Sequence, residues 1–355
     1  MTRAVTRRLF LWCAIAAGAA ASGDDVHVLV AVQGKVTVKR KGWTTSAPAG
    51  FGTFLRRGDL VRLTSPAQAT VACADLSVHQ LPDGKASGVP CPIENKAIAI
   101  YEGSLINPTR SEASEEVPVV ISPRRTKLLS PRPILRWAPM PGITRFKVSL
   151  RGPGVNWTAA VDGATSVSYP ADAPALTPGA TYKVSVNAGG HSSDELSEPG
   201  LGFTLLTEDA AKTIRAEAQR ISGLPLPADA AQLLTAHVYA SHGLHAEAIE
   251  RLEALAKAHP APRVWQTLGN LYQTAGLNRL AEERYVRAAK DSLATGDIES
   301  QALAQQSLGV LYQQAFGLPG EATSAFRDAL TLFEKLGDAR SVQELKERLA
   351  HDQNP

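Results

Sequence analysis

The best candidate metal ligands in this chain are three histidines and a glutamate that lie close together in the sequence, His237, His242, His245 and Glu247. Imidazole nitrogen and carboxylate oxygen both bind zinc. Two of the histidines, however, flank Gly243, and polar residues are expected beside a glycine turn between helices whether or not they hold a metal. We therefore expect an ordinary turn here, and no metal or other cofactor.

The segment HSSDE at 191–195 contains the residue types of a hydrolytic triad. The members of a triad must converge from separate elements to reach the right geometry, whereas these residues share one short loop. The sequence also has no nucleotide-binding loop, no H-E-x-x-H, no G-x-S-x-G and no C-x2-C pair. These observations favour a protein that is not an enzyme.

Three further features could bind a ligand at the surface. Arg57-Gly58-Asp59 spells an adhesion tripeptide, although a turn also explains Gly-Asp at this point. Lys39-Arg40-Lys41 beside Trp43 could engage an acidic polymer or a glycan, and the alternative is a solvated hairpin tip. Trp157 is either a core residue or an exposed platform for stacking on sugar. Trp43 and Trp157 are therefore the candidate glycan-binding residues.

Residues 1–22 have the parts of a secretory signal peptide. Basic residues come first, an apolar run extends from Leu9 to Ala17, and small residues with an Ala-x-Ala site follow at 19–21. The segment TRRLFL also resembles a twin-arginine signal, but no later segment looks like a cofactor site that requires export in the folded state. We favour the general secretory route and expect an exported protein of the periplasm or cell envelope, or a secreted one.

Charge and cysteine content narrow the class further. The formal net charge of +3 is too small for bulk binding to nucleic acid. Beyond the signal peptide only Cys73 and Cys91 remain, and in an oxidising compartment they most simply form a disulfide. A pair of free, buried thiols is the alternative. No later segment is continuously apolar over about 18 residues, so the sequence predicts no membrane span in the mature chain.

The stretch WQTLGNLYQTAGLNRLAEERYVRA at 265–288 has large and small residues at the spacing of a packed helix pair. It resembles a tetratricopeptide (TPR) repeat, W-x2-L-G-x2-Y-x8-A-x3-Y-x2-A. Small residues that face large ones let two antiparallel helices approach closely. The packing positions are Trp265, Leu268, Gly269, Tyr272, Ala281, Tyr285 and Ala288.

Two neighbouring stretches repeat this pattern. The upstream copy, within 236–260, is weaker and has no tryptophan, and the second unit should have a longer second helix through KDSLATGD. A closing helix is expected at 339–349, and three units meet the usual minimum for a stable stack. The downstream copy is displaced by one residue at the Gly317 to Gly320 turn, and its packing positions are Leu308, Gly309, Tyr312, Ala322, Phe326 and Ala329.

The TPR resemblance implies a concave groove lined by the first helices of successive units. Amides and a guanidinium on its floor can bond to an extended backbone without requiring a charged ligand. An ordinary solvated concave face is the alternative, and too few basic residues are present to support a carboxylate clamp. By register, the candidate protein-binding residues are Arg263, Gln266, Asn270, Gln273, Gln306, Gln313 and Gln314.

Residues 26–106 show strand periodicity, with valines at alternate positions from Val26 to Val32 and a turn at Gly34. The runs GKVTV at 34–38 and GDLV at 58–61, with a short strand at 69–75, resemble the β domain of FecR-type proteins. A FecR regulator also has a cytoplasmic segment and a membrane span, and a signal peptide takes their place here. The resemblance therefore implies a small β domain for contacts in the envelope, not iron-dependent signalling.

Two more segments complete the chain before the helices. The polar stretch at 107–118 is closed by prolines and indicates a linker. Short alternating runs at 119–206 predict a β-sandwich that resembles a fibronectin type III-like module. There Trp137 would be a core aromatic, and Tyr182 would form a tyrosine corner. Thr207 is then a plausible N-cap for the first helix.

The sequence thus predicts a multidomain protein in which an N-terminal all-β part is followed by an all-α TPR solenoid at 207–350. We expect a non-enzymatic envelope protein that acts as an adaptor and holds a protein partner in the TPR groove. The alternative is a protein that binds cell-wall glycan or peptidoglycan through its β domains.

Overall fold

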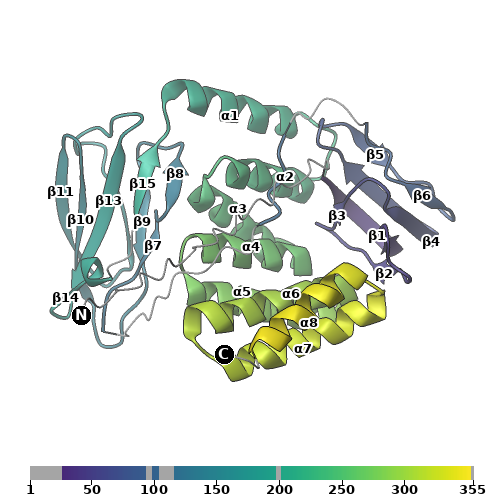
Figure 1. Cartoon of the computed structure of the whole chain (residues 1–355). Coiled ribbons are helices and arrows are strands. Elements are labelled where there is room, and N and C mark those ends of the chain that lie inside the picture. Colours follow the sequence, from purple (N-terminus) through teal and green to yellow (C-terminus); the bar gives the residue numbers. More distant parts are fainter. Residues whose placement is uncertain (1–25, 93–97, 104–115, 197–200, 353–355) are drawn as a thin grey trace, which may run out of the picture.

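The computed structural model describes residues 26–92, 98–103, 116–196 and 201–352. Strands come first in the chain and helices last, as predicted. The helices stack into an array that lies between a first β domain and a β-sandwich (Figure 1). The predicted signal peptide and most of the predicted linker fall outside the described residues. Within those residues, no helix combines the length and the apolar character needed to cross a membrane.

The first β domain is one sheet with the order β2-β1-β4-β5, in which β3 also pairs with β1 and β6 with β4. Valine and leucine alternate with polar residues along the two long strands, so one face of each enters a core around Leu29, Val36 and Leu63. Cys73 and Cys91 form a disulfide with their Cα atoms 5.6 Å apart. The strands are β1 (His27–Lys39), β2 (Ala47–Pro48), β3 (Phe54–Leu55), β4 (Leu60–Ala72), β5 (Val78–Gln80) and β6 (Ala86–Gly88).

The second β part is a sandwich of two sheets, with the orders β11-β10-β13-β15-β8 and β12-β9-β7. Trp137 is buried in the core between them, as expected. The Tyr182 hydroxyl accepts a bond of 2.7 Å from the N–H of Thr177, which is the contact of a tyrosine corner. The strands are β7 (Val120–Ser122), β8 (Thr126–Leu128), β9 (Ile134–Trp137), β10 (Arg145–Gly152), β11 (Val155–Asp162), β12 (Ser166–Ser168), β13 (Thr181–Ala188), β14 (His191–Ser192) and β15 (Gly202–Leu205).

The helical array begins directly after the sandwich. The Thr207 side chain accepts from the N–H of Ala210 and caps the first helix, as predicted. The predicted long second helix and closing helix are also present, as α5 and α8. The helices are α1 (Glu208–Ser222), α2 (Ala228–Ser241), α3 (His245–Ala258), α4 (Pro262–Thr274), α5 (Asn278–Thr295), α6 (Ile298–Leu311), α7 (Pro319–Leu336) and α8 (Ala339–Asp352).

Three helix pairs, α2 with α3, α4 with α5, and α6 with α7, close their turns in the same way. In each pair a leucine N–H after the turn donates to a tyrosine carbonyl at the end of the first helix. The donors and acceptors are Leu244 to Tyr239, Leu277 to Tyr272 and Leu318 to Tyr312. The last pair has one residue more between them, because a π turn, Tyr312–Phe316, follows α6. This extra residue is the displacement that the sequence shows near Gly317.

The helix pairs pack through the small residues that the repeat pattern singles out. A Cβ atom at Gly269 would lie 2.3 Å from the Tyr285 ring, and one at Gly309 would lie 2.5 Å from the Phe326 ring. Of the predicted packing positions, Trp265 and Tyr312 are half-buried and the others are buried. Within each pair the aromatic ring therefore occupies the space that a larger residue on the first helix would need.

We expect Gly269→Ala to lower the free energy of unfolding by about 1 to 3 kcal/mol, the usual cost of overpacking a tight core. Urea denaturation followed by circular dichroism measures this change. Gly320→Ala is the matched control, because a Cβ there meets no atom within 4 Å and the residue lies in α7. If both variants have the stability of the natural chain, the tight packing of Gly269 on Tyr285 is refuted.

The sandwich is fixed to the array at the turn between α2 and α3. The N–H of Lys127 on β8 donates to the carbonyl of Gly243 at 2.8 Å. The N–H of Leu129 donates to Glu247 Oε1, also at 2.8 Å. Burial, partly opposed by this bond, raises the pKa of Glu247 to about 7. The sandwich therefore meets the array through main-chain contacts and a buried carboxyl.

Candidate binding groove

Most of the predicted groove residues are buried. Arg263, Gln266 and Gln273 on α4 and Gln306 on α6 are each less than a tenth exposed. Arg263 and Asn270 contact the first β domain and the segment 98–103 that follows it. The expectation of an open groove is therefore wrong for this structure, because the chain fills the groove with its own N-terminal part. Gln313 and Gln314, in the π turn after α6, are half-buried.

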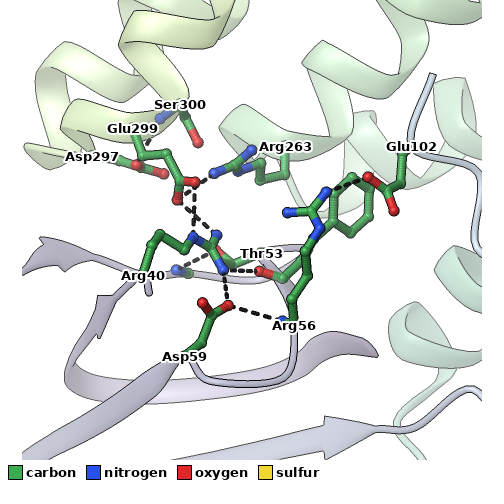
Figure 2. Close-up of polar contacts among 11 residues, drawn as sticks. Arg40, Thr53, Arg56, Asp59, Glu102, Arg263, Asp297, Glu299 and Ser300 are labelled. Carbon is green, nitrogen blue, oxygen red and sulfur yellow. Dashed lines mark hydrogen bonds and ion pairs between the residues drawn. The ribbon is translucent and has the colours of Figure 1, made fainter. Parts of the chain in front are cut away.

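A cluster of four charged side chains lies at the centre of this contact (Figure 2). Arg40, at the end of the long first hairpin strand, donates from Nε and Nη2 to the two oxygens of Glu299, at 3.0 and 2.8 Å. Its Nη1 donates to Asp59 Oδ2 at 2.5 Å. Arg263 Nη2 reaches Glu299 Oε2 from the array at 2.7 Å. Two positive and two negative groups thus meet where the β domain touches α4 and α6.

The charges in this cluster support one another. Burial alone would raise the pKa of Glu299, but Arg263 and Arg40 hold it below the ordinary value. Burial alone would also lower the pKa of Arg40, but Glu299 and Asp59 hold it above the ordinary value. All four groups are less than a tenth exposed, so each depends on its partners in place of water. The cluster therefore stabilises the docked arrangement only while it is complete.

Apolar side chains surround the charged cluster. Trp43 and Ala47 pack among helix residues that include Phe326 and Phe333. The Phe51 ring lies 4.5 Å from the His259 ring, and the Phe54 ring lies 5.4 Å from the ring of His237. The β domain thus makes an interface with an apolar surround and a charged centre.

The segment Ile98–Gly103 lies along the array next to α2 and α4. The Tyr101 hydroxyl is 3.1 Å from Thr274 Oγ1, and the Tyr101 carbonyl accepts from His237 Nδ1 at 3.0 Å. Asn270 Nδ2 donates to the Glu102 carbonyl at 3.2 Å. Two side chains of first helices therefore bond consecutive main-chain carbonyls of an adjoining segment.

The environment of His237 is apolar and closed. Burial lowers its pKa to about 4, and the bond to the Tyr101 carbonyl only partly opposes this effect. Because a carbonyl can only accept, Nδ1 must carry the proton of the neutral ring. The contact with Tyr101 therefore requires one tautomer of a neutral histidine.

The amides of the predicted groove form a network behind the segment. The Tyr285 hydroxyl lies 2.9 Å from both Asn270 Oδ1 and Gln273 Oε1. Gln266 Nε2 donates to Ser307 Oγ on α6 at 2.9 Å, which links two repeats. These contacts orient Asn270 so that its Nδ2 points toward the segment, while Gln266 and Gln273 serve the array itself.

The candidate surface ligands of the first β domain are also occupied. Arg40 and Asp59 are in the buried charged cluster, so neither the basic run at 39–41 nor the tripeptide at 57–59 is free as a whole. Trp43 is buried and its ring is not open to a sugar. Trp157, on β11, is half-buried and lies 5.4 Å edge-on to the Tyr169 ring. Of the two candidate glycan-binding residues, only Trp157 keeps an accessible edge.

The other sequence candidates for chemistry are separated by the fold. His237 meets Tyr101, His242 Nε2 lies 2.8 Å from Glu217, and His245 Nδ1 bonds the carbonyl of Arg125. They do not converge on one point. In the HSSDE loop, Ser192 and Glu195 form a capping box around a short 3-10 turn. A third group, His27 with Cys73 and Cys91, has its two sulfurs joined in the disulfide.

Comparisons with known proteins name no family. No family model and no curated protein matches the chain. Two solved structures are similar in part. BtubC (BKLC) from P. vanneervenii has 17% identity over 41% of this chain and 72% of its own, with a TM-score of 0.26. MamA protein has 18% identity over 37% of this chain and 86% of its own, with a TM-score of 0.20. At these scores the similarity carries no argument about function.

The residues that fill the groove have no signature in the sequence. Glu299 looks like an acidic residue in a first helical turn, and Tyr101 like part of a polar connection. Arg40 and Glu299 are 259 residues apart, so local patterns cannot pair them. The only available signal is the chemistry of the groove amides, which predicts a main-chain ligand without saying where it comes from.

Proposed function

We propose that this protein is an exported, non-enzymatic adaptor whose TPR-like array binds an extended polypeptide segment. Asn270 and His237 supply the main-chain contacts in this proposal. In the absence of a partner, the chain's own segment Ile98–Gly103 occupies the same positions. The FecR-type and fibronectin type III-like resemblances are consistent with an envelope protein and belong to the same proposal.

One observation carries it. Asn270 and His237 bind the carbonyls of Glu102 and Tyr101, which every peptide of suitable shape also presents. Main-chain recognition by groove side chains is how extended peptides gain affinity without sequence-wide complementarity. The Tyr101 side chain adds selectivity, because its hydroxyl meets Thr274. The expected partner is therefore an extended segment with a tyrosine followed by an acidic residue.

A labelled peptide with the sequence of residues 96–104 tests this function on the full chain. Tyr101→Ala weakens the internal segment, and the peptide should then bind at least about tenfold more tightly than it binds the natural chain, because a larger fraction of molecules has a free groove. Fluorescence anisotropy gives both affinities. Adding Asn270→Ala to the same variant should weaken peptide binding again.

Two controls make the result decisive. A peptide with alanine in place of its tyrosine should bind neither chain, and circular dichroism must show that the Tyr101→Ala chain is folded. If that folded variant does not bind the natural peptide, or binds both peptides equally, the array does not act as a peptide groove and the proposed function is wrong.

A further inference from the structure

The strand β11 ends its sheet, and nothing in the sheet order lies beyond it. Each of its eight residues pairs with one on β10 in a continuous register, from Val155 opposite Gly152 to Asp162 opposite Arg145. Figure 1 shows β11 on the side of the sandwich that faces away from the helices. The other strands at the sheet edges, including β7, β8 and β12, have two or three residues. β11 is thus the long free edge of this fold.

The free hydrogen-bonding groups of β11 follow from its hairpin. A two-residue turn makes Gly152 and Val155 a hydrogen-bonded pair, and such pairs alternate with non-bonded ones along an antiparallel ladder. The N–H and C=O groups that point away from β10 therefore belong to Asn156, Thr158, Ala160 and Asp162. Within the part of the chain that the structure describes, none of these groups has a backbone partner on that side.

This edge has none of the features that normally prevent strand pairing. Proteins protect long edges with proline, with lysine, with bulges or with a covering element. β11 reads VNWTAAVD, without proline, lysine or arginine, and its register with β10 has no bulge. An edge of this kind is a template for another strand.

We propose that β11 pairs antiparallel with β11 of a second copy of this chain, around a twofold axis at Ala159. In this register Thr158 faces the second copy's Ala160 and Asn156 faces its Asp162, so all four outward-pointing residues of each copy become hydrogen-bonded. A twofold contact uses the same surface on both copies and closes without further growth. The two sheets then form one continuous sheet.

The side chains in this register are complementary. On the outer face each Asp162 has Arg145 of its own copy on one side and gains the second copy's Asn156 amide on the other. On the inner face Trp157 meets the second copy's Val161, an aromatic with a β-branched residue. No like charges face each other across the axis, since Asp162 is the one charged residue of the strand. These pairs favour a second copy over an unrelated strand.

Cysteine cross-linking of the full chain tests the register. Opposite residues of a non-bonded antiparallel pair have Cα atoms about 4.5 Å apart, within disulfide range, so Ala159→Cys should link two copies under mild oxidation. Thr158→Cys is the matched control, because its own copy across the axis is displaced along the strand to roughly 8 Å. Non-reducing electrophoresis and mass spectrometry of the linked peptide give the result. Equal linking of both variants, or none, overturns the register.

A proline variant tests the interface without cysteine. Ala160→Pro removes an N–H that points away from β10, so the sandwich keeps its own ladder while the second strand loses a donor. We expect the dimer dissociation constant to rise at least about tenfold, with Ala160→Val unchanged, in sedimentation over about 1 to 100 µM. A natural chain that stays monomeric throughout, or a dimer that Ala160→Pro leaves intact, refutes the proposal. Neither result bears on the peptide groove.

Discussion

Replacing Glu299 with alanine is expected to lower the free energy of unfolding by about 3 to 5 kcal/mol, the cost of breaking a buried ion group by removing one partner. Arg40 loses both bonds to the Glu299 carboxylate, and Arg263 loses its ion pair. Both arginines are less than a tenth exposed, so neither can regain water while the β domain stays docked. Urea denaturation followed by tryptophan fluorescence measures the loss, and Trp43 at the interface reports on undocking.

Two further variants separate this effect from an ordinary loss of a surface charge. Glu344→Ala removes an exposed carboxylate that pairs only weakly with Arg348, and should change stability by less than about 1 kcal/mol. Arg263→Leu combined with Glu299→Leu removes one charge of each sign and leaves the Arg40 to Asp59 pair, so it should recover much of the loss. A single Glu299→Ala variant as stable as Glu344→Ala would refute the role of the cluster.

The second large effect is a dependence on pH that passes through His237. Its pKa is about 4 in the folded chain and about 6.5 in an unfolded one, so the unfolded state binds the proton first as pH falls. The contribution of His237 is complete above pH 6.5 and is lost as pH falls through 4. The difference amounts to about 3 kcal/mol over this interval. His237→Gln should therefore be less sensitive to acid than the natural chain.

The comparison between variants is needed because Glu247 acts in the opposite direction. Its pKa is raised to about 7, so its neutral form is favoured on folding and its contribution is complete below the unfolded value. That contribution is lost as pH rises through 7. In the natural chain the two groups offset each other between about pH 4.5 and 6.5.

Unfolding free energies at pH 4.5 and 7.5 give the test for His237. The gap between the natural chain and His237→Gln should narrow or reverse at the lower pH. His191→Gln, on the exposed loop of the sandwich, is the matched control and should keep a constant gap. If the gap for His237→Gln is also constant, the buried neutral histidine is not the source of the acid sensitivity.

The sequence was sufficient to predict the repeats, since their packing is local. Gly269 and Tyr285 are 16 positions apart on paired helices, and the size of the one dictates the size of the other. The same holds for the Thr207 cap and for the tyrosine corner at Tyr182, where each residue meets a neighbour a few positions away. Such contacts recur in many chains and leave a spacing that can be recognised.

The content of the groove could not be predicted, because its contacts join distant parts of the chain. The register correctly placed Asn270 on a surface suited to main-chain binding, and the structure shows the Glu102 carbonyl there. Nothing in the sequence indicates that this carbonyl comes from the same polypeptide. The burial of Arg40 and Trp43 is likewise a property of the docked pair of domains, whereas each domain alone would expose them.

The docked β domain also changes how the helical array should unfold. In an isolated repeat protein each unit contacts only its neighbours, so the array can lose its units one at a time. Here one β domain touches His237 on α2, Asn270 on α4 and Glu299 on α6, with the segment that follows it. It acts as a brace across all three units, and the loss of any one unit forfeits contacts in the others. The array is therefore a cooperative body instead of a chain of independent units.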